Sequence, residues 1–193
     1  MAQITEEHPH DGQAHGGMMS YKKFAVMMAV SFVVMYAVMY LHTYVWGHVY
    51  FSEMRFYMTT LMILSMAVVM LGLMWGMYPD PRVKRGIVAS AVIGFGIVVW
   101  IERSQVFVED ESWMSSMIPH HSIAILTSER ADIDDVRVRE LAKEIIRAQR
   151  REIAEMEWLL DDIASNGKVM SEADLPGREV PEMPDDLYSG GPR

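Results

Sequence analysis

Three long apolar segments constrain this chain more than any other feature of its sequence. They cover residues 24–41, 57–78 and 86–101, and the second contains no charged residue. A helix needs roughly 20 residues to cross the hydrocarbon core of a bilayer. The third segment is short, but it reaches that length if Glu102 and Arg103 extend toward the headgroups. The sequence therefore predicts an integral membrane protein in contact with lipid, with spans at about 24–44, 57–78 and 86–103.

The basic residues set the expected orientation of these spans. A lysine pair at 22–23 precedes the first span, three basic residues lie within 82–85, and the first connection carries only Arg55. Basic loops stay in the cytoplasm. We therefore expect a multi-pass protein of the plasma (inner) membrane, with a cytoplasmic N-terminus and everything after about residue 104 extracytoplasmic.

Aromatic residues gather near the ends of the apolar segments, as amphipathic rings do at a membrane interface. They are Tyr36, Tyr40, Tyr44, Trp46, Tyr50, Phe51, Trp75, Tyr78 and Trp100. Their positions support the span boundaries and say nothing about a substrate.

Charge is distributed unevenly along the chain. Residues 102–193 carry 11 Lys and Arg against 21 Asp and Glu, whereas residues 1–101 carry 6 against 5. An acidic outer half disfavours nucleic acid, whose recognition needs basic surface, and favours cations. The chain has no cysteine, which excludes disulfides and thiolate ligands.

The part of the chain after the third span is expected to form two helices. The first runs from about residue 106 to 130, and the second follows a turn at 131–134 and ends at about residue 164. The second helix has an apolar stripe that needs a partner surface. Asp132 or Asp134 can cap its start, and Asn166 with Gly167 can end it. Pro119 lacks a backbone donor, so the first helix should either kink there or restart from a Ser115 or Ser116 cap.

Six side chains on these helices form two sets of candidate metal ligands. They are Met117, His120 and His121 on the first helix and Gln149, Glu152 and Met156 on the second. At 3.6 residues per turn, each set projects from one side of its helix, so we expect each to converge. Thioether and imidazole donors favour a transition metal, with copper first and zinc or iron possible.

Two helices bury little surface by themselves. We therefore expect the hairpin to pair with the same hairpin of another subunit, giving a four-helix bundle in a homodimer or higher homo-oligomer. The expected fold is all-α, with three transmembrane helices followed by this extracytoplasmic hairpin.

The hairpin resembles the domain of unknown function 305 family over about residues 113–163. The resemblance is carried by Met117, Ile118, Pro119, His120, His121, Ala124 and Ile125, and by Leu141, Ala142, Ile145, Ile146, Gln149, Glu152, Ile153, Met156, Trp158 and Leu159. It implies a ferritin-like helical bundle linked to copper through His and Met, with the same six ligands. The chain looks like half of the longer, duplicated soluble members, which favours assembly between subunits.

Three functional hypotheses follow. The first is binding of a transition metal for sequestration or homeostasis. The second is a membrane-anchored oligomerisation module in which His120, His121, Gln149 and Glu152 form a structural hydrogen-bond network without metal. The third is an enzyme, which is disfavoured because Met117 stands where a di-iron bundle has the Glu of its Glu-x-x-His motif, although a zinc hydrolase could formally use His120, His121 and Glu152.

The sequence divides into four parts: a flexible His-containing tail at 1–20, the transmembrane region at 21–103, the metal-binding hairpin at 104–165 and a Pro/Gly-rich acidic tail at 166–193. His8, His10 and His15 in the first tail are solvated or form a weak metal chelate. Methionine also recurs at every fourth residue, at Met54, Met58, Met62, Met66, Met70 and Met74. This methionine ridge provides adaptable helix packing or, alternatively, thioethers for a soft cation.

Overall fold

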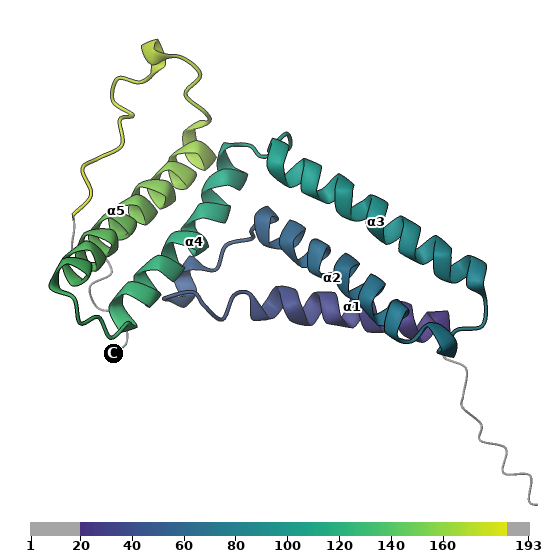
Figure 1. Ribbon diagram of the computed structural model, residues 1–193. Coiled ribbons are helices and arrows are strands. Elements are labelled where there is room, and N and C mark those ends of the chain that lie inside the picture. The colour runs from purple at the N-terminus through teal and green to yellow at the C-terminus, as the bar shows by residue number, and fades with distance from the viewer. Residues whose placement is uncertain (1–19, 185–193) are drawn as a thin grey trace, which may run out of the picture.

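The computed structural model describes residues 20–184, and every regular element in that range is helical. The long helices are α1 (Tyr21–Val38), α2 (Glu53–Leu73), α3 (Pro81–Ser104), α4 (Asp110–Arg130) and α5 (Val136–Asn166) (Figure 1). Short 3₁₀ turns lie at Trp46–His48, Trp75–Met77 and Glu172–Asp174. The predicted all-α class is confirmed for the described residues.

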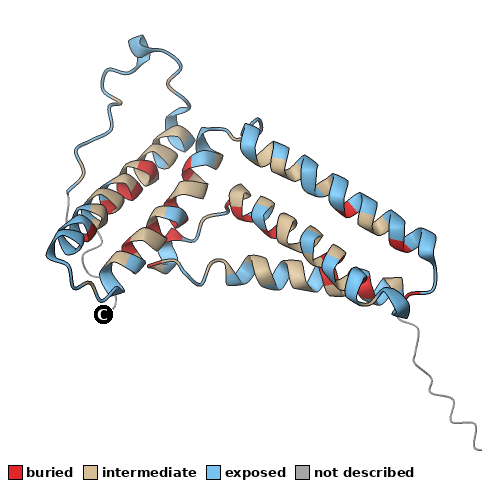
Figure 2. Ribbon diagram, in the orientation of Figure 1, coloured by how far each residue is buried: buried red, intermediate tan, exposed pale blue. Residues whose placement is uncertain are grey.

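Helices α1, α2 and α3 form the membrane unit. Each is long and apolar enough to cross a bilayer, and α2 packs against both of the others. The side chains of Val33, Leu73 and Ile93 are exposed on its outside, and Figure 2 shows how few residues of α3 are buried. Apolar surface of this extent is unusual on a soluble protein and suits lipid. The prediction of three membrane helices is confirmed.

Each membrane helix begins earlier than the apolar pattern indicates, because a polar cap precedes it. The Ser20 and Ser52 hydroxyls accept hydrogen bonds from Lys22 N and Arg55 N, and the Asp80 side chain accepts one from Arg82 N. Such caps satisfy free donors in the first turn. The first helix also ends early, at Val38, so residues 39–44 belong to the connection and not to the span.

Helices α4 and α5 form an antiparallel hairpin next to one end of the membrane unit (Figure 1). Their shared core contains Met114, Ile118, Ile125, Ile153 and Met156, all buried. The facing sides of both helices carry most of the buried residues of this part (Figure 2). Helix α5 ends as predicted, with Gly167 as its C-cap at φ 77°, a conformation that favours glycine.

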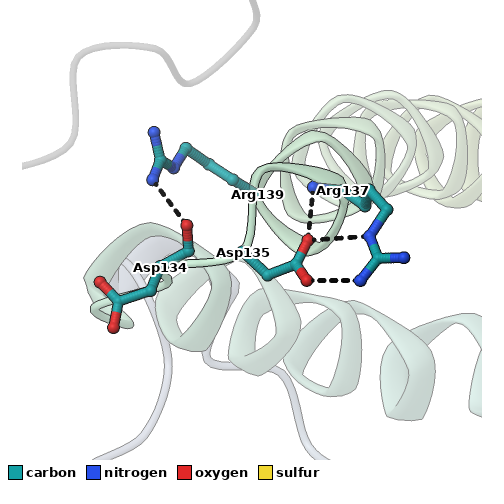
Figure 3. Close-up of polar contacts among 4 residues, drawn as sticks. All are labelled: Asp134, Asp135, Arg137 and Arg139. Carbon is teal, nitrogen blue, oxygen red and sulfur yellow. Dashed lines mark hydrogen bonds and ion pairs between the residues drawn. The ribbon is translucent and has the colours of Figure 1, made fainter.

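The start of α5 differs from the prediction. The N-cap is Asp135, whose Oδ1 accepts from Arg137 N at 2.9 Å, and neither Asp132 nor Asp134 caps the helix (Figure 3). Asp135 also holds the Arg137 guanidinium, and Arg139 donates to the Asp134 carbonyl (Figure 3). These arginine contacts fix the turn and leave the Asp135 carboxylate as the acceptor for the first free backbone donor.

The connection between α1 and α2 inserts into the hairpin. Tyr44 is buried among the hairpin core residues, and its backbone N donates to Ser122 Oγ at 2.7 Å. The same hydroxyl lies 3.0 Å from His48 Nδ1. Tyr44 thus packs inside the hairpin core, and its predicted position at the membrane interface stays a prediction. Part of the partner surface that the hairpin needs comes from its own chain, whereas pairing with a second copy stays a prediction.

Pro119 lies inside one continuous helix, because α4 runs from Asp110 to Arg130 without a new cap at Ser115 or Ser116. Arg55 Nη2, at the start of α2, lies 3.4 Å from the Pro119 carbonyl oxygen and donates to it. The Arg55 guanidinium also stacks over the Tyr40 ring, with 4.3 Å between Cζ and the ring centroid. Arg55 thus links the membrane unit to the middle of α4.

The chain after α5 runs back along the hairpin. Arg178 donates to the Asp162 carboxylate and to the Gly167 carbonyl, and Lys168 pairs with Asp110 at 3.2 Å. The described part of this tail, 167–184, is mostly irregular, as expected. The expected flexible tail at 1–20 lies outside the described residues except for Ser20, and so does the segment 185–193.

Replacing Ile153 by Ala tests the hairpin core. Ile153 has no exposed surface, so the change leaves a cavity and should cost about 2–5 kcal/mol of unfolding free energy. Thermal unfolding of the purified full-length protein measures this as a lower Tm. Arg147→Ala, at an exposed position of the same helix, is the control and should cost no more than about 0.5 kcal/mol. Equal shifts for both variants would contradict the assigned core.

Candidate metal centre

Three of the six predicted ligands meet where α4 faces α5. His121 Nδ1 lies 3.2 Å from Glu152 Oε2, and Gln149 Nε2 donates to the same carboxylate oxygen at 3.2 Å. The His121 side chain is 14% exposed and that of Glu152 is 39% exposed. The α5 residues stand one turn apart, so a single helix face presents the amide and the carboxylate to the imidazole.

His121 Nδ1 and Glu152 Oε2 face each other across the contact between α4 and α5. Nδ1 and Oε2 are at ion-pair distance, yet Nδ1 is fully buried and makes no hydrogen bond to any described residue. Two ligands of one tetrahedral ion, each at roughly 2.0–2.1 Å, stand about 3.3–3.4 Å apart. The observed separation of 3.2 Å is close to that value.

Burial lowers the pKa of His121 below its ordinary value of 6.5. The Glu152 carboxylate opposes this shift, whereas the neighbouring His120 adds to it. At neutral pH the imidazole is therefore uncharged, which is the form that binds metals.

His120 does not join this group. It lies on the exposed part of α4 and lines a cavity of about 450 Å³ beside the start of α2. The His120 and His121 rings have centroids 6.3 Å apart and are tilted by 54°. One imidazole thus faces the membrane unit and the other faces α5, because adjacent helical residues point about 100° apart.

The two methionines are also separated from the His121–Glu152 pair. Met156 is buried in the hairpin core, and Met117 packs against that core and lines the same cavity as His120. The structure therefore distributes the six predicted ligands over three places: His121, Gln149 and Glu152 between the helices, Met156 in the core, and Met117 with His120 facing α2.

Within residues 20–184, no three His, Cys, Asp or Glu side chains gather into a metal-binding group. A copper or other transition-metal ion, which the family resemblance implies, would find two strong ligands here, His121 and Glu152. Gln149 turns its amide nitrogen toward Glu152, which orients the carboxylate. The residues fit half of a metal site, with a positioned carboxylate and a neutral imidazole.

Several polar residues at this end of the molecule escaped the sequence analysis. Ser122 anchors the inserted connection, and Arg150 of α5 donates to Glu129 of α4. Arg55 entered the sequence analysis only as the basic residue of the first connection, and Glu53 was not singled out, yet both line the cavity beside His120. Their signal in the sequence was a pair of charges at the start of an apolar helix, which a span boundary explains equally well.

The fold and this site define a class: a three-span helical membrane protein with a helical hairpin docked on one end. The profile of the family described as domain of unknown function (DUF305) matches residues 104–185. The chain belongs to this family.

One relative extends the similarity beyond the hairpin. The uncharacterized protein L153 of Acanthamoeba polyphaga mimivirus is 35% identical over 116 residues, which are 59% of this chain and 74% of the relative. A continuous stretch of that length within 193 residues necessarily includes α3. No solved structure matches the chain.

Replacing Glu152 by Gln should lower the pKa of His121 further, because the carboxylate is the group that opposes the effect of burial. Imidazole NMR titration of the full-length protein measures the shift. Glu155→Gln is the matched control, because Glu155 pairs with Arg151 on the same helix, and it should leave His121 unchanged. An increase in the His121 pKa in Glu152→Gln would show that the two groups do not face each other.

The lowered pKa of His121 also makes stability depend on pH. Between the folded pKa and 6.5 the unfolded chain binds a proton that the folded protein does not, so stability rises with pH in this window. The Tm of the wild type should fall as the pH drops below about 6.5, and His121→Ala should reduce this dependence. An undiminished pH dependence in the variant would assign it to other groups.

Proposed function

We propose that the protein is a membrane-anchored metal-binding protein that holds a transition-metal ion between α4 and α5 for sequestration or homeostasis. The observation that carries this proposal is the approach of His121 Nδ1 to Glu152 Oε2 at 3.2 Å without a hydrogen bond. An ion held by the two atoms would form two metal–ligand bonds where no hydrogen bond joins them.

Copper is the first candidate for the ion. Imidazole and carboxylate accept divalent copper, zinc and iron, and sites of this kind bind Cu²⁺ most tightly among them. The protein's part is to keep His121 neutral by burial and to hold Glu152 in place through Gln149. Metal affinity should therefore persist to lower pH than an exposed histidine would allow.

A second copy of the chain is the proposed source of the remaining ligands. The first two turns of α5 leave Val136, Val138 and Leu141 exposed, and Leu141 lies on the same stripe as Glu152. Pairing of two hairpins along this stripe would cover apolar surface and bring two half-sites together. The resulting homodimer would be a four-helix bundle of the ferritin-like kind.

The alternative function is an oligomerisation module in which these polar groups only specify how helices pair. The hydrogen bond from Gln149 Nε2 to Glu152 Oε2 favours this alternative, because these two side chains are already connected without an ion. Such a module binds no metal and gains no thermal stability when metal is added.

Calorimetric titration of the full-length protein with Cu²⁺ separates the two functions. The wild type should bind the ion, and His121→Ala and Glu152→Gln should each weaken binding by at least about tenfold, since even groups that only support ligands cost 10–100-fold. His42→Ala is the control, because His42 is exposed in the connection between α1 and α2. No heat of binding in the wild type, or equal affinity in all four proteins, would refute the metal site.

The orientation of the protein is part of this proposal. The basic residues in the first turns of α3, Arg82, Lys84 and Arg85, and the lysines at the start of α1 favour a cytoplasmic location for that end of the membrane unit. The hairpin docks on the opposite end (Figure 1). We accordingly assign the hairpin to the extracytoplasmic side of the plasma (inner) membrane.

Single cysteines test the orientation, because the chain has none of its own. Ala131→Cys lies in the turn between α4 and α5, and Pro79→Cys lies in the loop before α3; both positions are exposed. In intact cells, a membrane-impermeant maleimide should label the first variant and reach the second only after permeabilisation. The reverse pattern would invert the orientation.

A further inference from the structure

The cavity of about 450 Å³ between α2 and α4 has an unusual lining. Methionine makes up 19 of the 193 residues but four of the fourteen that line this cavity, so thioether sulfur is concentrated there. No described residue of α5 lines it. The cavity is therefore separate from the site between α4 and α5.

The four methionines come from three different elements. Met39 is the C-cap of α1, Met54 and Met58 stand one turn apart at the start of α2, and Met117 lies on α4. Met39 Sδ lies 3.2 Å from Thr59 Oγ1, which places its thioether beside α2. Met54 and Met58 belong to the methionine ridge, whereas Met39 and Met117 come from other elements, so the ridge alone does not produce this lining.

Two further donors complete this lining. His120 contributes an imidazole, and Glu53 contributes a carboxylate. The Glu53 Oε2 atom is fully buried and has no hydrogen-bond partner among the described residues. A buried carboxylate oxygen without a partner is costly, and a bound cation removes that cost.

The charge balance favours a monovalent ion. Glu53 supplies one negative charge, which Arg55 offsets within the same lining, and the thioethers are neutral. Arg55 also lines the cavity, although its guanidinium contacts the Pro119 carbonyl and the Tyr40 ring. Its positive charge repels a divalent ion about twice as strongly as a monovalent one. Thioether sulfur selects soft ions such as Cu(I).

We infer that Met39, Met54, Met58, Met117, His120 and Glu53 form a second metal site, specific for a soft monovalent cation such as Cu(I), where α2 meets α4. This site would occupy the outer end of the methionine ridge. It uses the two predicted ligands, Met117 and His120, that the structure turns away from α5. It needs no second copy of the chain.

Cu(I) competition with bicinchoninate tests the site on the full-length protein under reducing, anaerobic conditions. The test variant is Met54→Leu with Met58→Leu, because Leu and Met have similar volumes and the exchange disturbs packing little. The matched control is Met62→Leu with Met66→Leu on the same ridge, since neither residue lines the cavity. His121→Ala keeps this test separate from the site between α4 and α5.

The wild type, the control pair and His121→Ala should bind one Cu(I) with the same affinity. The test pair should lose at least about tenfold in affinity, since loss of ligands costs no less than loss of their supporting groups. X-ray absorption at the copper edge should show sulfur neighbours in the wild type and fewer in the test pair.

Absence of Cu(I) binding in the wild type would overturn the inference, as would equal losses in the test and control pairs. Loss of all Cu(I) binding in His121→Ala would also overturn it and leave the proposed function intact. The second site would be supported if His121→Ala still bound Cu(I) and the test pair did not. This holds even if no Cu²⁺ binds between α4 and α5.

Discussion

The insertion of Tyr44 into the hairpin is the contact on which the rest of the structure depends. Two helices cannot bury a sufficient core alone, and the side chain of Tyr44 supplies a third surface against Ile118 and Ile153. Its backbone and His48 both bind the Ser122 hydroxyl. A connection that would otherwise lie free above the membrane thus holds α4 against the start of α2.

This docking determines where the proposed metal ligands face. With α4 between α5 and the membrane unit, one of its two adjacent histidines faces α5 and the other faces the start of α2. His121 meets a carboxylate, which suits a divalent ion, whereas His120 shares a cavity with thioethers, which suit a monovalent one. The two adjacent histidines therefore lie beside different kinds of side chain, one between α4 and α5 and one between α4 and α2.

The sequence predicted well what depends on local pattern. The three spans follow from apolar length, and the end of α5 follows from Gly167. Predictions failed where a neighbouring element decides the outcome. The helical period gives the directions of His120 and His121 around α4, but it cannot tell which neighbouring helix each side chain meets. Tyr44 is an aromatic residue of the kind found at membrane interfaces, yet it packs in the hairpin core. Among three aspartates in one turn, the arginine contacts of Figure 3 leave Asp135 as the cap.

The most direct test of the central claim is anomalous scattering at the copper edge from crystals of the full-length protein grown with copper. The account predicts an anomalous peak within bonding distance of both His121 Nδ1 and Glu152 Oε2, the two atoms that lie 3.2 Å apart. A peak confined to exposed histidines such as His42, with the space between α4 and α5 showing only the Glu152 hydrogen bond to Gln149, would contradict it.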